Sequence, residues 1–149
     1  MSEIRFYHME QSTIDKALPA ITMKAVQSGK KILIKAADKK EVKRLSDLLW
    51  SFRGDTFLAH GMDGDKNAEQ QPVFVTTKDD NVNEAKILIL TGGCTHEDVA
   101  QFDLTCEMLD GRVESQIADA RARWKVYKEA DHDLTYWQQD DNGAWGKRA

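Results

Sequence analysis

The residues best suited to chemistry lie in the last third of the chain, between positions 112 and 129. Arg121, Lys125 and Lys128 are spaced at i, i+4 and i+7, so a helix would place their charges along one edge. No acidic residue interrupts the stretch 121–128, although the chain as a whole carries a net charge of −4. Three cations in a row can bind carboxylate groups through charge-assisted hydrogen bonds.

An apolar stripe runs beside this basic row. Its members, at spacings of 4, 3, 4 and 3, are Val113, Ile117, Ala120, Trp124 and Tyr127. Such a stripe is typical of an amphipathic helix that packs on a sheet. Arg123 points to the other edge of the stripe, away from the basic row. The simplest interpretation is a packed helix with a solvated basic edge, favoured in part by the helix dipole.

The functional alternative is a groove in which the basic row binds carboxylates while the aromatic stripe receives an apolar side chain. This arrangement suits a short acidic peptide that ends in a hydrophobic residue with a free carboxylate. A strand of nucleic acid is the other candidate ligand, with Trp124 as a stacking platform. The pattern alone does not choose between these two ligands.

Other possible sites have weaker support. Thr91-Gly92-Gly93 follows an apolar run, where a phosphate loop could lie, but neither the dinucleotide-binding nor the P-loop glycine spacing occurs, so a tight turn is favoured. Cys94 and His96 are too few for a zinc site, and Cys106 is distant in sequence. We therefore expect no metal, no cofactor and no catalytic residue, with a nucleotide-binding α/β enzyme as an alternative.

The composition is that of one globular domain. The 149 residues are 41% hydrophobic and 31% charged, and no apolar run reaches the roughly 18 residues of a membrane span. The first residues lack the features of a signal peptide, and two cysteines make no disulfide framework, so we expect a cytoplasmic protein without a membrane partner. The net charge of −4 argues against a protein that coats nucleic acid.

Strands and helices are expected to alternate along the chain. The expected strands are 4–9, 31–35, 73–77, 87–90 and 102–109, with a β-like piece at Phe57-Leu58. The expected helices are 12–29, with a kink or a late start at Pro19, 38–52, with Phe52 on its apolar face, and 112–129. Residues 60–72 are expected to form an exposed loop, and 87–90, the most apolar run, to be the central strand.

This alternation predicts an α/β sandwich with a mostly parallel sheet. No internal repeat or linker is found, so residues 1–149 are predicted to form a single domain. Residues 131–149 are predicted to be a polar, aromatic-bearing C-terminal tail packed on that domain.

Seven segments, taken in order, form a recognisable set: Arg5-Phe6-Tyr7, Gly29-Lys30-Lys31-Ile32-Leu33-Ile34, Leu48-Leu49-Trp50-Ser51-Phe52-Arg53, Thr56-Phe57-Leu58-Ala59-His60-Gly61, Gln71-Pro72-Val73-Phe74, Ala120-Arg121-Ala122-Arg123-Trp124-Lys125 and Leu134-Thr135-Tyr136-Trp137-Gln138-Gln139. With these segments in this order and spacing, the chain resembles the chi subunit family of bacterial DNA polymerase III along almost its full length. The resemblance implies a Rossmann-like three-layer fold without retained nucleotide chemistry.

The resemblance also implies a role. A chi subunit is a non-catalytic accessory subunit that links the clamp loader to single-stranded DNA-binding protein by capturing that protein's acidic C-terminal tail. The tail-binding positions implied here are Arg121, Trp124, Lys125 and Lys128. Ile117 stands where some relatives have a basic residue, so the basic row is shorter in this chain.

A second partner is implied as well, the psi subunit or another clamp-loader component, with only indirect contact with DNA. Tyr136, Trp137 and Trp145 are candidates for that interface, and packing of these rings back onto the domain is the simpler interpretation. Asp131 stands where relatives often have glycine, so the resemblance does not predict the conformation of the turn that follows.

Overall fold

The computed structural model describes residues 2–51 and 60–149. Its α-helices are α1 (Ile14–Val26), α2 (Lys39–Ser51) and α3 (Glu114–Glu129). Its strands are β1 (Glu3–Met9), β2 (Ile32–Lys35), β3 (Gly61–Met62), β4 (Val73–Thr76), β5 (Ile87–Leu90), β6 (Leu104–Asp110), β7 (Asp133–Gln139) and β8 (Trp145–Lys147). Short 3₁₀ helices occupy Ala68–Gln70 and Val99–Gln101.

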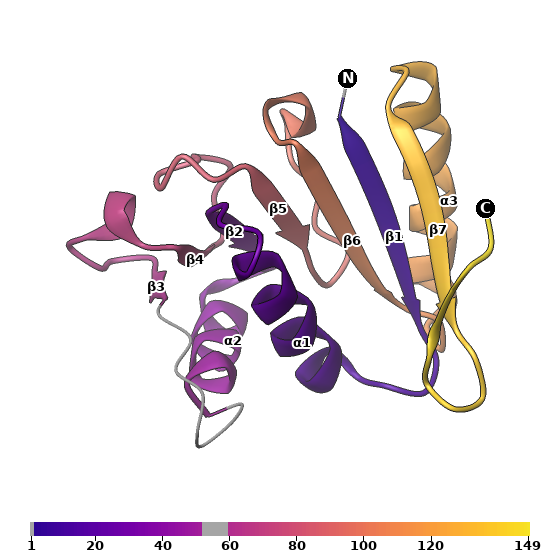
Figure 1. Ribbon diagram of the computed structural model, residues 1–149, viewed down its shortest axis with the longest axis horizontal. Helices are drawn as coiled ribbons and strands as arrows, with labels where there is room; N and C mark the ends of the chain where they lie inside the picture. Colours follow the sequence, from indigo (N-terminus) through magenta and orange to yellow (C-terminus); the bar gives the residue numbers. More distant parts are fainter. Residues whose placement is uncertain (1, 52–59) are drawn as a thin grey trace.

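In this described part of the chain the strands form one eight-stranded sheet in the order β3-β4-β2-β5-β6-β1-β7-β8 (Figure 1). Neighbouring strands are parallel except for β7 and β8, which are antiparallel. The expected central strand, β5, lies in the middle of this order and is buried along its whole length. Helices α1 and α2 cover one face of the sheet and α3 the other (Figure 1).

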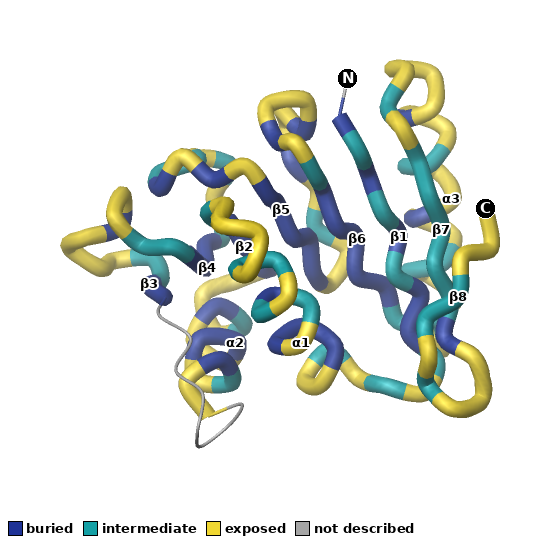
Figure 2. Tube along the Cα trace, in the orientation of Figure 1, coloured by how far each residue is buried: buried dark blue, intermediate teal, exposed yellow. Residues whose placement is uncertain are grey.

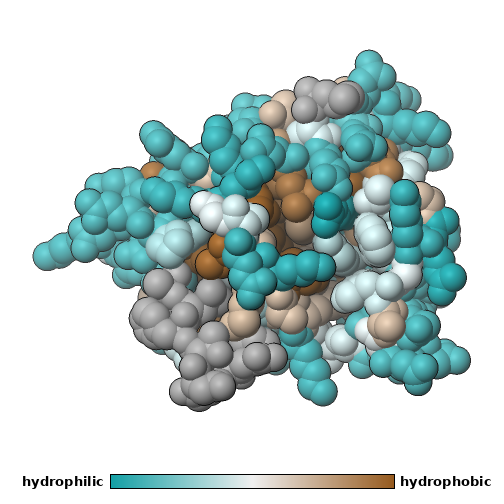
Figure 3. Space-filling model, in the orientation of Figure 1, coloured by the Kyte–Doolittle hydropathy of each residue, from teal (hydrophilic) through white to brown (hydrophobic). Residues whose placement is uncertain are grey.

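Alternation of side chains along the strands divides the core into two layers. On β2, Ile32 and Ile34 pack with residues of α1 and α2, whereas Leu33 packs in the layer beneath α3. Burial is densest along the central strands (Figure 2), and hydrophilic residues surround the apolar middle of the face that carries α1 and α2 (Figure 3). The predicted three-layer α/β sandwich with a mostly parallel sheet is confirmed.

Most expected elements lie within a few residues of the observed ones. Helix α1 begins before Pro19 and contains it, because the amides of Lys16 and Ala17 already bond to the Thr13 carbonyl at 3.1 and 3.0 Å. A late start at Pro19 is therefore wrong. The expected loop 60–72 contains β3 and a 3₁₀ turn. Phe52 and Phe57-Leu58 lie outside the described residues.

Residues 131–149, expected as a tail packed on the domain, add two strands to the sheet. Strand β7 pairs with β1, and β8 pairs with β7. Tyr136 stacks on Phe6 with ring centroids 6.1 Å apart, and Trp145 meets Tyr7 edge-on at 5.2 Å. These contacts agree with the interpretation in which the two rings pack back onto the domain.

Asp131, which precedes β7, adopts the left-handed conformation at φ 62° that glycine favours, so the helix ends there in the same geometry without glycine. Among the described helices, none is both long and apolar enough to cross a membrane.

Candidate peptide-binding site

Helix α3 rests on the sheet through the expected apolar stripe. Ala120 and Tyr127 are buried, and Ile117 and Trp124 are partly buried against the same core layer. Val113 is the exception, because it precedes the helix in an extended conformation and is 37% exposed. The stripe is confirmed from Ile117 onward.

The basic row lies along the exposed edge of α3. Arg121, Lys125 and Lys128 are all exposed, and at 1.5 Å rise per residue they span roughly 10 Å of the helix. In residues 2–51 and 60–149, none of the three forms an ion pair. Their charges are therefore available to a ligand from outside the chain.

Arg123 has a different role from the basic row. Its Nε donates to both Glu107 carboxylate oxygens, at 2.7 and 3.0 Å, and the Tyr127 hydroxyl donates to the same carboxylate at 2.6 Å. Glu107, on β6, is only 2% exposed. Burial raises the pKa of the Glu107 carboxyl, and the nearby Arg123 charge opposes that rise. Arg123 thus holds α3 to the sheet, and the structure confirms that it lies away from the basic row.

A pocket of about 400 Å³ opens between α3 and the edge of the sheet that is formed by β7 and the residues after β8. Its lining residues are Ala120, Arg121, Trp124, Lys125, Tyr136 and Ala149. The structure therefore brings together three of the four residues expected to bind a peptide tail, namely Arg121, Trp124 and Lys125. Lys128 does not line the pocket and lies three residues farther along the same helix.

The inner wall of the pocket is aromatic. Trp124 packs at a tilt on the buried ring of Phe6, with centroids 5.4 Å apart, and edge-on against Tyr136 at 6.1 Å. The Tyr136 hydroxyl lies 2.5 Å from His8 Nδ1, which fixes its ring. Burial raises the pKa of the Tyr136 hydroxyl, and the Arg121 charge partly opposes that rise. The wall is therefore neutral and apolar at physiological pH.

These features define what the pocket can bind. Its lining is mainly apolar and its volume falls within the range of small ligand sites, so one large apolar side chain can be buried there. Arg121 and Lys125 at its rim can meet carboxylates on the same ligand. A ligand that carries an apolar end group next to negative charges fits both features.

Two lining residues, Tyr136 and Ala149, were not expected at this site from the sequence. The sequence indicates Tyr136 only as a candidate contact for a second partner, and it gives no signal for Ala149. The β-forming run Leu134-Thr135-Tyr136-Trp137 was the available signal for a strand, and period-2 alternation along it would have placed Leu134 and Tyr136 on one face.

Metal and thiol chemistry find little support in the described part of the chain. No group of three or more potential metal ligands is found there. Cys106 is buried, which raises the pKa of its thiol to about 12, so it stays protonated at neutral pH. The Thr91-Gly92-Gly93 segment forms a turn in which the Cys94 amide donates to the Thr91 carbonyl at 3.0 Å.

In nucleotide-binding α/β folds, a loop between a parallel strand and the next helix, in the position of the loop between β1 and α1, can hold phosphate on backbone amides. Here the side-chain oxygen of Gln139, on β7, accepts hydrogen bonds from three consecutive amides, those of Glu10, Gln11 and Ser12, at 2.9, 3.0 and 3.0 Å. Its nitrogen donates to Ser12 Oγ at 2.7 Å and to the Gly143 carbonyl at 3.2 Å. These amides are therefore satisfied within the chain.

Gln139→Ala should destabilise the fold by about 2 kcal/mol, because one change leaves several donors and acceptors without partners. Gln139 is 3% exposed, so water cannot fully replace its amide. Urea denaturation would measure the loss, and hydrogen exchange should show faster exchange at the amides of Glu10, Gln11 and Ser12.

Gln138→Ala is the matched control. Among the described residues, the Gln138 side chain makes one hydrogen bond, from Nε2 to Glu10 Oε1 at 2.7 Å, and it is half-buried. Gln138→Ala should therefore lower the free energy of unfolding clearly less than Gln139→Ala does. If both variants lose the same stability, the hydrogen bonds of Gln139 to three amides contribute no more than the single bond of Gln138.

Fold and site together describe a small α/β sandwich domain with an apolar surface pocket rimmed by cations. The chain belongs to the DNA polymerase III chi subunit family, because the family model described as "DNA polymerase III chi subunit, HolC" matches residues 1–135. This match confirms the resemblance to the chi subunit family that the seven sequence segments indicate.

A curated relative, "Probable DNA polymerase III subunit chi" from Rickettsia prowazekii (strain Madrid E), is 27% identical over 90 residues. The alignment covers 60% of this chain and 54% of the relative, so the chain spans about half the length of that protein. Two pocket residues, Tyr136 and Ala149, lie beyond the residues matched by the family model.

Proposed function

We propose that this chain is a non-catalytic accessory subunit of DNA polymerase III that binds the acidic C-terminal tail of single-stranded DNA-binding protein. In this role it links that protein to the clamp loader, directly or through a psi subunit, in the bacterial cytoplasm. Membership of the chi subunit family supports the assignment to the polymerase. The tail-binding step rests on the geometry of α3 and its pocket.

The observation that carries the proposal is the pairing of an apolar pocket with cations that have no ion-pair partner in the described residues. Arg121 and Lys125 belong to the pocket lining, and Lys128 extends the same row along α3. The last apolar side chain of a tail would lie beside Trp124. Its terminal carboxylate and adjacent aspartates would then meet the row.

A direct single-stranded DNA-binding module is the second candidate. It requires Trp124 to offer a free ring face for base stacking. Phe6 and Tyr136 pack against that ring, at 5.4 and 6.1 Å, which reduces the face available to a base. The net charge of −4 also disfavours binding to a phosphate backbone. Both observations favour the peptide.

The test is a titration with a labelled short peptide that has adjacent aspartates and a C-terminal phenylalanine, run beside a single-stranded oligonucleotide at the same physiological salt. We expect saturable peptide binding and weak or undetectable oligonucleotide binding. The same peptide with an amidated C-terminus should bind about tenfold more weakly, since it loses one charge-assisted contact.

Oligonucleotide binding as tight as peptide binding, with a steep salt dependence, would reverse the ranking of these two functions. Equal affinity for the free-acid and amidated peptides would contradict recognition of the terminal carboxylate.

A further inference from the structure

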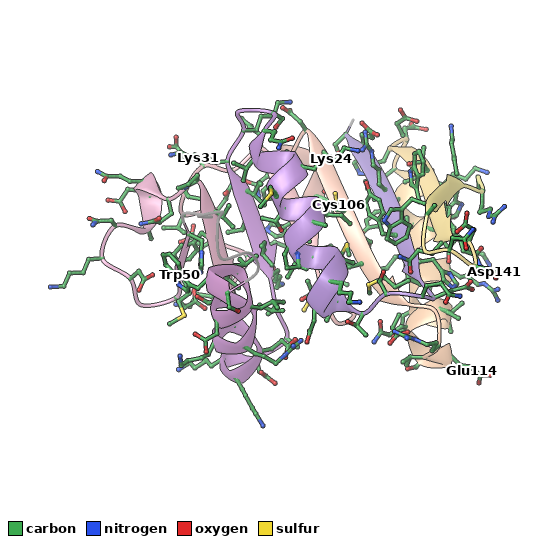
Figure 4. All side chains as sticks on the ribbon, turned by 60° about the horizontal axis from the view of Figure 1, so that its bottom comes forward. Lys24, Lys31, Trp50, Cys106, Glu114 and Asp141 are labelled. Atoms are coloured by element: carbon green, nitrogen blue, oxygen red, sulfur yellow. The ribbon has the colours of Figure 1, made fainter. Side chains whose placement is uncertain are left out.

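The hairpin of β7 and β8 lies beside the pocket, which Tyr136 of β7 and Ala149, just after β8, help to line. Its turn is held by Asp140, whose Oδ1 accepts from the amides of Asn142 and Ala144 at 2.8 and 3.0 Å. Gly143, at φ 82°, completes the turn. Asp141 marks this turn in Figure 4, on the same side of the molecule as Glu114 at the start of α3 and away from Trp50. From Tyr136 onward, the hairpin lies beyond the residues matched by the family model.

Strand register decides which face each residue of β8 occupies. Trp137 pairs with Lys147, and Gln139 with Trp145, whose ring packs in the core layer beneath α1 and α2. Paired residues share a face, so Lys147 lies on the α1 and α2 side of the sheet. The next residue, Arg148, lies on the opposite side, the one that carries α3.

The backbone beyond β8 supports this placement. The amides of Arg148 and Ala149 both donate to the Tyr136 carbonyl, at 2.7 and 3.4 Å, and the Ala149 carbonyl accepts from the Tyr136 amide at 3.2 Å. Two residues therefore oppose one, which is the pattern of a β-bulge. Because Ala149 lines the pocket together with Tyr136, the bulge brings this segment to the pocket wall.

Arg148 is exposed and forms no ion pair within the described residues. In the bulge it lies opposite Tyr136, and residues directly opposite each other on neighbouring strands are typically about 5 Å apart between Cβ atoms. Tyr136 lines the same pocket as Arg121 and Lys125, but it comes from strand β7 and not from α3. Cations therefore lie at or beside the pocket on two parts of the chain, α3 and the segment that follows β8.

We propose that Arg148 is a further ligand-binding residue of this pocket, which contacts a carboxylate of the acidic peptide from the side opposite the α3 row. This inference rests on the proposed function, since it names a second contact for the same ligand. It makes the hairpin a determinant of affinity for acidic tails.

The experiment compares Arg148→Ala with Lys147→Ala in the full chain, by fluorescence anisotropy with the aspartate-rich peptide that ends in phenylalanine. The two variants remove the same charge from adjacent residues on opposite faces. Arg148→Ala should weaken binding about three- to fivefold, as expected for one exposed charge pair, and lower the salt dependence. Lys147→Ala should change the dissociation constant less than about 1.5-fold, because a charge on the far face is screened.

A double-mutant cycle between protein and peptide tests directly whether Arg148 contacts an aspartate of the peptide. Replacing one peptide aspartate with asparagine should cost less binding with Arg148→Ala than with the parent chain, if the two groups touch. Equal effects of Arg148→Ala and Lys147→Ala, or no change with Arg148→Ala while Lys125→Ala weakens binding, would overturn the assignment of Arg148 and leave the proposed function standing. If Lys125→Ala changes neither the affinity for the peptide nor its salt dependence, the proposed function is wrong, and the Arg148 contact is wrong with it.

Discussion

Replacing Arg123 with methionine is expected to destabilise the fold by about 3 kcal/mol, because it removes one partner of a buried ion pair. The side chain of Arg123 is 15% exposed and that of Glu107 is 2% exposed. Without the guanidinium, the Glu107 carboxylate keeps the Tyr127 hydroxyl as its hydrogen-bond donor among the described residues. Urea denaturation at neutral pH, with its midpoint and slope, would measure the change.

Two variants control this measurement. Glu107→Gln in the Arg123→Met background removes the buried charge and keeps an acceptor for Tyr127, so most of the lost stability should return. Arg112→Met breaks an exposed ion pair with Asp110 at 2.9 Å and should have little effect. If Arg112→Met and Arg123→Met lower the free energy of unfolding equally, the unpaired buried Glu107 carboxylate is not the cause of the destabilisation.

The pH dependence should identify the same carboxylate. Burial raises the pKa of Glu107, and Arg123 opposes the rise, so removing Arg123 raises that pKa further. A carboxyl group with a raised folded pKa destabilises the fold above that pKa and has no such effect below its unfolded value. The difference in unfolding free energy between Arg123→Met and the parent chain should therefore shrink as the pH falls to about 4.5.

This pair also shows what the sequence pattern does not reveal about Arg123, namely its buried partner. Helical spacing places it correctly, on the far side of the apolar stripe from the basic row. Its partner, Glu107, is on β6, and nothing local marks a glutamate in an expected strand as the contact of an arginine on the next helix. A variant of Arg123 therefore reports on stability and cannot serve as a control for peptide binding.

The fold was largely predictable because its central strands are short apolar runs. Residues 87–90 and 32–34 are buried on both faces of a parallel sheet, and such uninterrupted apolar runs predict strands even when their partners are unknown. Strand β7 was not predictable in the same way. Its residues are mostly half-buried, with Thr135 and Gln138 among them, because one neighbour is only the short strand β8.

The site was predictable as far as one helix determines it. Arg121, Trp124 and Lys125 belong to α3, and the 3.6-residue period relates their positions directly. Tyr136 and Ala149 reach the same pocket through the pairing of β7 with β1 and with the segment after β8. Strand order and register are non-local, so a single sequence does not specify them.

The largest loss of peptide affinity is expected from Trp124→Ala. The indole forms the inner wall of the pocket, beside Ala120 and Tyr136, where the terminal apolar side chain of the peptide would be buried. A buried aromatic anchor is worth about 2 kcal/mol, so the dissociation constant should rise roughly 30-fold. The salt dependence of binding should stay nearly unchanged, since no charge is removed.

Lys125→Ala and Arg121→Ala should show the opposite pattern, with affinity reduced several-fold and a flatter salt dependence. Lys24→Ala is the matched control, because Lys24 is an exposed lysine on α1, on the other face of the sheet (Figure 4). Its removal changes net charge by the same amount and should leave both affinity and salt dependence almost unaltered.

Because Trp124 packs on buried Phe6, the alanine variant needs a check of its fold. Circular dichroism and a denaturation curve would give the folded fraction at the titration temperature, and the dissociation constant is then expressed per folded molecule. Trp124→Phe retains a ring against Phe6 and should keep most of the affinity. If a folded Trp124→Ala protein binds the peptide as tightly as the parent chain, the apolar end of the ligand is bound elsewhere, and the pocket beside α3 is not the tail site.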